Sequence, residues 1–389
     1  MYSFLSLLLG LVAAVWTVQS IRALTGILQL PRLQRIPLLD PADCPRVSII
    51  FAARDEAEKL PAAIETMLDL DYPDYEVIAV DDRSSDATGT ILDDFARRDP
   101  RLRVVHISSL PPGWLGKPHA LDLAARLATG RWLVFTDADV HFAPDTPRRV
   151  MKLALDQSLD HLSLLTKMIT IGFWERVVMT YFSLGFTFGQ ESWKAGDPRS
   201  PRYVGIGAFQ LIRRETYDAV GGHRRLAMEV IEDMKLGKLV KLGGFRSQAA
   251  IATEHIGVRW HAGLRNLIRG TTKNFFAAAG FQLWKVVFQI LGLLLMCVLP
   301  WIALPWLLLT DRHGPLLVCA AIAVGAAMFF HTFISVGNRL SPLYGLTHPI
   351  GALIFAWMIL RSAAITLRRG GVVWRDTFYP LADLRRGLV

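Results

Sequence analysis

The sequence predicts an α/β protein with a mostly parallel sheet and attached membrane-spanning helices. Between residues 47 and 139, short and continuously apolar runs alternate with segments of helical periodicity. Fully apolar strands separated by helices are typical of a parallel sheet that is covered on both faces. Longer apolar runs flank this region, and each approaches the roughly 20 residues that a helix needs to cross a bilayer. One such segment is N-terminal and about three are C-terminal.

The predicted strands and helices follow one another in regular order. Strands are expected at residues 47–51, 77–80 and 104–107, and a fourth in the run 132–139, which ends in Asp137 and Asp139. Apolar residues at helical spacing after Leu60 predict the first helix, and further helices are expected at 87–97 and 118–128. Pro118 suits a first helical position, and Gly130 ends that helix before the fourth strand.

Acidic residues follow three of these strands, at the point where each strand ends. They are Asp55 and Glu56, Asp81 and Asp82, and Asp137 and Asp139. Ligands of open α/β sheets bind beyond the carboxyl ends of the strands, so these acids are expected to line one site.

The pair Asp137 and Asp139 predicts a bound cation. Two carboxylates about 4 Å apart repel by roughly 4 kcal/mol at an effective dielectric near 20. Mg²⁺ suits this place, because it is commonly held by one or two carboxylates together with substrate phosphates. A strand followed by an Asx turn would produce the same pattern without an ion.

Four apolar stretches predict a multi-pass membrane protein: residues 2–21, 286–309, 316–336 and 346–360. No positively charged residue precedes the first stretch, and its apolar run is longer than that of a signal peptide. We therefore expect an uncleaved anchor. Arg22, Arg32 and Arg35 follow it and favour a cytoplasmic location for the next domain, with the chain anchored in the inner (plasma) membrane. The arginine-rich C-terminal end also favours the cytoplasm, which conflicts with three further spans. A re-entrant or interfacial segment, broken at Pro300 or Pro305, would resolve the conflict.

Charge, cysteine content and motifs limit the classes of binding partner that the sequence is compatible with. The chain has 43 basic and 34 acidic residues, for a net charge of +9, which suits nucleic acid or anionic lipid. No zinc finger or nucleic-acid motif is present, so the bilayer is the expected partner and nucleic acid is not. The three cysteines have no metal-ligand spacing and are expected to be inert thiols. The first strand is not followed by the glycine pattern of a dinucleotide site.

Residues 47–274 resemble family 2 glycosyltransferases, which have the nucleotide-diphospho-sugar transferase fold. The resemblance depends on five elements in order: Arg54-Asp55-Glu56, the run 81–88, Gly113-Trp114-Leu115-Gly116-Lys117, Asp137-Ala138-Asp139 and Ile231-Glu232-Asp233. The third element is similar to that of membrane enzymes that glycosylate hopanoids, carotenoid acids or ceramides. The resemblance therefore implies a hexosyltransferase that makes glycolipids.

The resemblance also implies a donor site for a nucleotide-diphospho-sugar, with a UDP-sugar favoured. Asp55, Glu56, Asp81 and Asp82 would surround the uridine and ribose. Lys117 would lie near the donor phosphates or sugar, although a solvated lysine is the plain alternative.

The remaining donor-site elements concern the diphosphate and the sugar. Asp137 and Asp139 match the motif that binds the diphosphate through Mg²⁺ or Mn²⁺, and His255 stands where some relatives have a further metal ligand. Gly205 and Gly207 resemble a loop that lets the backbone approach the donor sugar. An ordinary core histidine and an ordinary turn are the respective alternatives.

Asp233, with Glu232 beside it, matches the catalytic base of the family. An acceptor hydroxyl needs a base within hydrogen-bonding reach, which contributes about 10²–10⁴-fold in rate. Direct displacement with inversion at the anomeric carbon follows from the resemblance. The alternative is that both acids only stabilise the first turn of a helix at 234–241.

The segment after the base departs from the pattern of processive synthases. Arg259-Trp260 is present, but Ile256 stands where those enzymes have Gln or Arg. Within residues 259–284, Arg265, Arg269 and Lys273 form a basic stripe against an apolar face, which predicts an interfacial amphipathic helix. The aromatic segment 168–193 is a second interfacial candidate.

These observations predict a domain order and a function. The expected parts are an anchor at 1–28, a linker at 29–45, a cytoplasmic glycosyltransferase domain at 46–258, an interfacial helix at 259–284, a transmembrane region at 285–367 and a basic tail at 368–389. The expected activity is metal-dependent sugar transfer to a hydroxyl of a membrane lipid. The alternatives are a processive polysaccharide synthase and an inactive membrane scaffold or sugar-nucleotide sensor.

Overall fold

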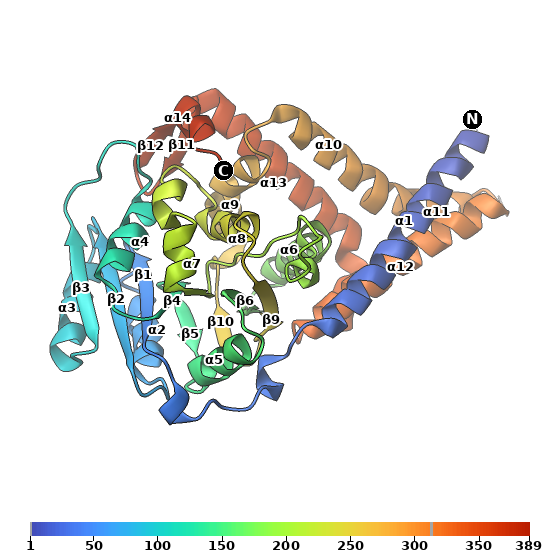
Figure 1. Ribbon diagram of the computed structural model, residues 1–389. Helices are drawn as coiled ribbons and strands as arrows, with labels where there is room; N and C mark the ends of the chain where they lie inside the picture. Colours follow the sequence, from blue (N-terminus) through green and yellow to red (C-terminus); the bar gives the residue numbers. More distant parts are fainter. Residues whose placement is uncertain (1, 312–313) are drawn as a thin grey trace. The chain divides into compact units, whose positions relative to one another are not determined.

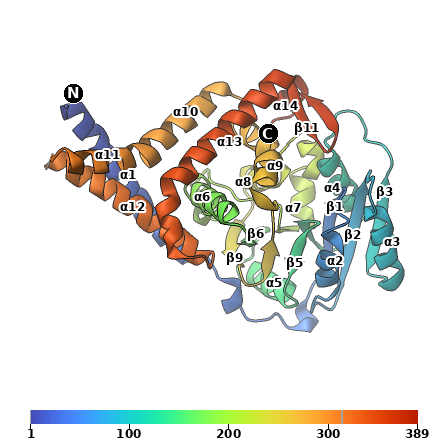
Figure 2. The ribbon, with the colours of Figure 1, turned by 180° about the vertical axis from the view of Figure 1, so that it is seen from behind.

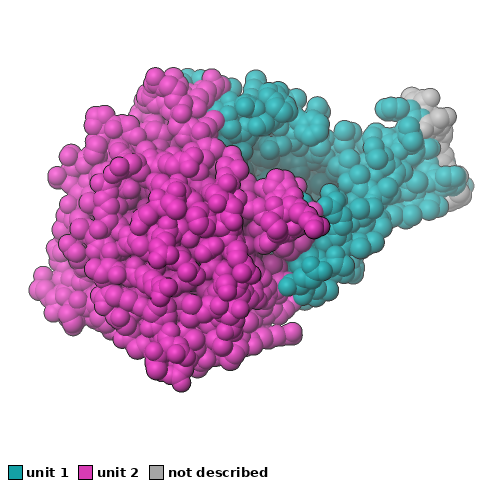
Figure 3. All heavy atoms as spheres, viewed as in Figure 1, with its two compact units in different colours: residues 1–29, 170–191, 260–370 teal, residues 30–169, 192–259, 371–389 magenta. Residues whose placement is uncertain are grey.

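The computed structural model describes residues 2–311 and 314–389, and the chain divides into two compact units. The sheet unit comprises residues 30–169, 192–259 and 371–389, coloured magenta in Figure 3. The helical unit comprises the described residues of 1–29, 170–191 and 260–370, coloured teal.

A seven-stranded sheet forms the centre of the sheet unit (Figures 1 and 2), in the order β3-β2-β1-β4-β8-β6-β9. The strands are β1 (Val47–Ala53), β2 (Tyr75–Asp82), β3 (Leu102–Ile107), β4 (Trp132–Asp137), β6 (His161–Leu165), β8 (Gln210–Arg213) and β9 (Ser247–Ile251). The strands β1 to β4 are parallel to one another and β6 is parallel to β9, whereas β8 runs antiparallel to both of its neighbours, β4 and β6. The predicted mostly parallel sheet is confirmed.

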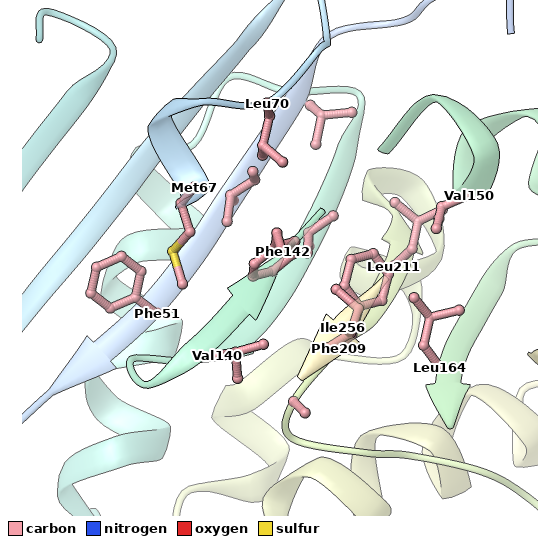
Figure 4. Close-up of a cluster of buried hydrophobic side chains, with 14 of the residues drawn as sticks. Phe51, Met67, Leu70, Val140, Phe142, Val150, Leu164, Phe209, Leu211 and Ile256 are labelled. Atoms are coloured by element: carbon pink, nitrogen blue, oxygen red, sulfur yellow. The ribbon is translucent and has the colours of Figure 1, made fainter. Parts of the chain in front are cut away.

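Helices cover both faces of this sheet because its strands are apolar on both sides. In β2, Val77 and Ala79 pack into one core, and Ile78 and Val80 pack into the other. The first core includes side chains of α2 (Leu60–Leu68), α3 (Thr88–Arg98) and α5 (Thr146–Asp156), and Figure 4 shows part of it. The second core includes side chains of α4 (Gly116–Leu127), α7 (Arg214–Ala219) and α8 (Glu232–Leu242). Each large side chain fully buried in these cores contributes roughly 1.5–3 kcal/mol.

The strand register aligns the acidic strand ends at one edge. Asp137 of β4 pairs with Ala52 of β1, and Ala53 pairs with Asp81 of β2. From β1 the chain proceeds outward to β2 and β3, and then returns to the other side of β1 as β4. Such a reversal opens a crevice at the carboxyl ends of the strands, where ligands of α/β folds bind.

Smaller elements complete the sheet unit. A three-stranded sheet contains β5 (Val140–Phe142), β10 (Ile256–Val258) and β7 (Lys167–Met168). A C-terminal hairpin of β11 (Gly371–Trp374) and β12 (Thr377–Pro380) precedes α14 (Leu381–Arg386). Short 3₁₀ turns are η1 (Leu33–Arg35), η2 (Pro41–Asp43), η3 (Ser192–Lys194) and η4 (Gly222–Leu226).

The helical unit contains the apolar segments predicted from the sequence. Its elements are α1 (Tyr2–Gln29), α6 (Phe173–Gln190), α9 (Gly263–Ala278), α10 (Leu283–Leu293), η5 (Leu294–Val298), α11 (Leu299–Leu309), α12 (Pro315–Gly337), η6 (Pro342–Thr347) and α13 (His348–Arg369). Over residues 2–311 and 314–389, four helical runs are long and apolar enough to cross a membrane: Phe4–Gln29, Leu283–Leu309, Pro315–Gly337 and Pro342–Arg369. The expected one N-terminal and three C-terminal segments are therefore present.

Local bounds differ from the expected ones where proline or long-range packing acts. The run 286–309 contains a π turn, η5, just before Pro300, which lies in the first turn of α11. Proline has no N–H to donate, and an added π turn is one way in which a helix accommodates such a position. The helix α4 begins at Gly116, so Pro118 is its third residue rather than its first.

The two units are assembled from segments that are not continuous in sequence. Residues 170–191, within the expected catalytic segment, belong to the helical unit, and residues 371–389 belong to the sheet unit. In α6, Tyr181 packs against the rings of His331 and His348, with centroids 6.0 and 5.4 Å away. This aromatic packing, which sequence periodicity does not report, explains why α6 joins the apolar helices.

Candidate active site

The paired aspartates lie at the end of β4. Asp137 is the last residue of that strand, and Asp139 lies in the turn before β5. The hydroxyl of Thr136 donates to the carbonyl oxygen of Ala208 at 2.8 Å. This hydrogen bond connects the end of β4 to the loop that contains Gly205 and Gly207. The carboxylates of the predicted metal motif therefore stand at the crevice formed by the strand reversal.

A lysine neutralises each of these two carboxylates. The Lys117 ammonium lies 2.6 Å from Asp137 Oδ1, and the Lys59 ammonium lies 2.8 Å from Asp139 Oδ2. Burial raises the pKa of Asp139, and the nearby Lys59 opposes this rise. The positive charge that the sequence demanded beside the aspartates is thus supplied by two lysines of the chain itself.

Lys117 also connects the aspartate pair to the candidate base. Its ammonium lies 2.7 Å from Glu232 Oε1, at the first residue of α8. Burial alone would lower the pKa of Lys117, but the charges of Asp137, Glu232 and Asp233 together hold it well above its ordinary value. Lys117 therefore remains a permanent cation among three carboxylates.

Glycines bring Asp233 close to the end of β4. The Gly207 N–H donates to Asp233 Oδ2 at 2.8 Å. A Cβ added to Gly207 would lie 3.0 Å from both Asp137 Oδ2 and Asp233 Oδ2, and one added to Gly205 would lie 2.0 Å from the Asp233 carbonyl oxygen. Only glycine fits at position 205, and a side chain at position 207 would crowd both carboxylates, so the predicted glycine loop packs directly against the two acids.

The environment of Asp233 suits proton transfer near neutral pH. Burial, followed by the charge of Glu232, raises the pKa of Asp233 to about 6, while Lys117 opposes the shift. A carboxylate with a pKa close to the working pH can both accept and release a proton. The arrangement can therefore remove a proton from a hydroxyl that enters beside Gly207.

The other predicted donor residues line the ends of β1 and β2. Asp55 Oδ1 accepts from the Ser85 N–H at 2.7 Å, and Asp81 Oδ2 lies 3.0 Å from His106 Nδ1. Hydrogen bonds to Asp81 and Asp93 raise the pKa of His106. Asp81 is thus engaged with a neighbouring strand.

Asp82 is paired with the next residue in the chain and packs against the start of α4. The Arg83 Nε donates to Asp82 Oδ1 at 2.7 Å, and that hydrogen bond raises the pKa of Arg83. A Cβ on Gly116 would lie 2.2 Å from Asp82 Oδ2. Gly116, the second glycine of the Gly-Trp-Leu-Gly-Lys motif, thereby lets Asp82 pack against the residue that precedes Lys117.

His255 is not gathered with the paired aspartates. Its Nε2 lies 3.6 Å from Asp145 Oδ1, its Nδ1 has no hydrogen-bond partner within residues 2–311 and 314–389, and burial lowers its pKa. Among the residues that the structure describes, no cluster of three or more His, Cys, Asp or Glu side chains could hold a metal ion. Its role as a ligand stays a prediction.

Several site residues were not identified from the sequence. A small cavity beside Asp233 is lined by Lys117, Leu121, Phe135, Thr136, Gly207, Gln210, His223, Glu232 and Asp233. In it, His223 is buried against Tyr217, whose hydroxyl lies 3.0 Å from His223 Nδ1. Burial lowers the pKa of His223 to about 3, so this imidazole is neutral. The sequence could have indicated Lys59 only by its position four residues after Asp55. No sequence pattern indicated Gln210 or His223.

Comparison with known proteins gives a family match for part of the chain. Residues 48–221 match the sequence model of Glycosyl transferase family 2. A beta-monoglucosyldiacylglycerol synthase of Trichormus variabilis is 26% identical over 298 residues, which is 70% of this chain and 60% of the relative. The synthase of the same name from Synechocystis is 27% identical over 95% of this chain and 84% of its own length.

Two further matches come from other groups. A 4,4'-diaponeurosporenoate glycosyltransferase of Staphylococcus aureus is 25% identical over 86% of this chain and 88% of its own length. A mannosyltransferase of Pyrobaculum calidifontis, solved with GDP-Man and Mn²⁺, is 20% identical with a TM-score of 0.49, covering 92% of this chain and 98% of that one. The chain spans about three fifths of the first of these relatives. The chain is therefore similar to glycosyl transferase family 2 over residues 48–221.

Proposed function

We propose that this enzyme transfers a sugar, with inversion, from a nucleotide-diphospho-sugar to a hydroxyl group of a membrane lipid. A UDP-sugar is the proposed donor. The proposal depends above all on Asp233, which meets Asp137 across Gly207 yet has no lysine of its own within ion-pair distance among the described residues. This arrangement supports one carboxylate for the cation and another for the acceptor proton.

Asp233 is proposed as the general base. The Gly207 N–H fixes one of its oxygens, and the other accepts from the Met234 N–H at 2.8 Å. Both bonds hold the carboxylate in one orientation before the acceptor arrives. Glu232 is proposed to keep Lys117 in place, since the two are paired at 2.7 Å.

The residues at the end of β4 fit a divalent metal ion. Asp137 and Asp139 offer the hard oxygen ligands that Mg²⁺ and Mn²⁺ prefer, and the two lysines now beside them mark a place where positive charge is needed. When bound, such an ion neutralises the charge that grows on the leaving diphosphate. His255 is kept as a proposed further ligand only if it moves from Asp145.

Lys117 is proposed to stay at the donor phosphates. Its charge does not depend on pH in the physiological range, because three carboxylates raise its pKa. A fixed cation there stabilises the leaving group without any reorganisation. Asp55, Glu56, Asp81 and Asp82 are proposed to hold the nucleoside at the neighbouring strand ends.

The proposed acceptor is a lipid hydroxyl presented at a bilayer. Two observations support this: the four apolar helices, and the similarity to a beta-monoglucosyldiacylglycerol synthase and a 4,4'-diaponeurosporenoate glycosyltransferase. The helix α9, with Arg265 and Arg269 opposite the buried Leu267, is proposed to lie at the interface. We further propose an inner-membrane location with the sheet unit in the cytoplasm, on the basis of Arg22, Arg32 and Arg35.

The test is transfer by the purified full-length protein in detergent micelles. Labelled UDP-glucose or UDP-N-acetylglucosamine is supplied with Mn²⁺ and either diacylglycerol or a bacterial lipid extract. We expect an organic-soluble glycolipid, its loss in Asp139→Ala, and ordinary activity in Asp156→Ala, a control whose exposed carboxylate only pairs with Lys152. The anomeric proton coupling of the product tests inversion.

Two outcomes would contradict the proposal and favour the alternatives. A water-soluble polymer as the main product would indicate a processive synthase. Nucleotide binding without turnover on any lipid tested would indicate a sensor.

A further inference from the structure

The hairpin that follows the last apolar helix has an unusual turn. Trp374 pairs with Thr377, so only Arg375 and Asp376 form the turn between β11 and β12. Both have positive φ angles, 49° and 62°. Two-residue hairpin turns of this type normally contain Asn-Gly, because most side chains disfavour this backbone conformation. Strained backbone of this kind clusters at ligand-binding sites, which makes this hairpin tip a candidate for one.

The hairpin is anchored to the strand ends that carry the donor residues. The Arg375 guanidinium forms an ion pair with Glu56, next to Asp55 after β1. The buried Tyr379 of β12 interacts with the side chain of Arg83, which is itself bonded to Asp82. Figures 1 and 2 both show the hairpin beside the start of α4.

The residues after the hairpin are attached to the same unit near the base. The Val389 N–H donates to Glu229 at 2.5 Å, and its carbonyl oxygen accepts from Lys235 Nζ at 2.5 Å. Lys235 is on α8, two residues after Asp233. The segment 371–389 is therefore attached at two places, through Arg375 to Glu56 and through Val389 to Glu229 and Lys235.

We propose that the hairpin tip is part of the donor site and that Arg375 binds the diphosphate of the sugar nucleotide. This rests on the function proposed above. Glu56 is close enough to Asp139 for their charges to interact, so Arg375 stands one carboxylate away from the paired aspartates. Its side chain remains 41% exposed, which leaves room for a ligand to approach.

The chemistry of the present contact resembles that of the proposed one. A guanidinium binds carboxylates and phosphates in the same forked manner. In the free protein Glu56 thus occupies the place of a phosphate, and the incoming diphosphate takes over Arg375. A purely structural tether is the competing explanation, and it predicts no preference for phosphate.

Nucleotide titration of the full-length protein in detergent with Mn²⁺ separates the two explanations. UDP and GDP are compared with uridine and guanosine. For the diphosphate that wild type binds, Arg375→Ala is expected to weaken affinity at least tenfold, with less than a twofold change for its nucleoside. Arg375→Lys should not restore the loss, because lysine lacks the fork. The donor KM should rise while the acceptor KM does not.

The matched control is Arg386→Ala, because Arg386 is exposed and, within the described part of the chain, forms its ion pair with Asp383 on its own helix. An unchanged diphosphate affinity in Arg375→Ala, or an equal loss for diphosphate and nucleoside, would overturn this inference alone. A wild-type protein that binds neither diphosphate would overturn the proposed donor site and this inference with it.

Discussion

Replacing Asp233 by Asn tests the proposed base with the smallest change of shape. The amide oxygen can still accept from the Gly207 N–H, which is now 2.8 Å from the carboxylate. The amide cannot take a proton from an acceptor hydroxyl. The substitution therefore removes the chemistry and leaves the contact with the glycine loop.

The expected magnitude follows from the role and from the pKa. At pH 7.5 most of Asp233 is ionised in wild type, because its pKa is about 6. General base catalysis contributes about 10²–10⁴-fold, so kcat should fall by that factor. At 1.36 kcal/mol for each tenfold, this is a barrier increase of about 2.7–5.4 kcal/mol. Donor KM should change little, since Asp137 and Lys117 are untouched.

The assay is initial-rate transfer from labelled UDP-sugar to lipid, at saturating donor and acceptor. Glu232→Gln is the matched comparison, because it removes a carboxylate paired with Lys117 at 2.7 Å and leaves the base. Its effect should appear mainly in donor KM. The melting temperature of either variant should change by less than roughly 4 °C, which corresponds to a change of about 1 kcal/mol in the free energy of unfolding for a domain of this size. An Asp233→Asn enzyme that keeps a tenth or more of the wild-type kcat would refute the base assignment.

Three further outcomes are expected. Chelation with EDTA should abolish transfer, and added Mn²⁺ or Mg²⁺ should restore it; full activity in EDTA would exclude the metal proposal. The transfer rate should decline about tenfold per pH unit below about pH 6, as Asp233 is protonated. In Lys117→Met this decline should begin at a higher pH, because Lys117 lowers the pKa of Asp233. An unchanged pH profile in that variant would contradict the coupling of the two residues. Gly237→Ala, whose Cβ would lie 1.8 Å from the Val204 carbonyl oxygen, should destabilise the sheet unit by about 1–3 kcal/mol. Gly196→Ala, with its nearest contact at 3.4 Å, should not, and equal melting temperatures would contradict this packing argument.

Much of the site was predictable because its residues follow strands in fixed order. A strand that ends in an acid places that acid at the carboxyl edge, whatever the rest of the fold does. Asp137 and Asp81 could thus be assigned to one edge before any register was known, and the register agrees. The apolar helices were equally visible, since length and composition alone mark them.

Other parts of the site could not be predicted in the same way. Lys59 is one of several lysines in the sequence, and its contact with Asp139 spans 80 residues. Gly207 and Asp233 are 26 residues apart, and their approach depends on how α8 packs against the loop before β8. The hairpin residue Arg375 reaches Glu56 across 319 positions. Nothing local in the sequence distinguishes these residues from solvated ones.

The sequence by itself determined the order of strands and helices, the acidic edge and the apolar segments. These features arise from local periodicity and from the side-chain types at each strand end, which every short stretch of sequence carries. Only the tertiary structure decided which cations face which acids, that α6 joins the apolar helices, and that residues 371–389 join the sheet unit. Those contacts depend on long-range packing, in which many weak interactions between distant segments select one arrangement.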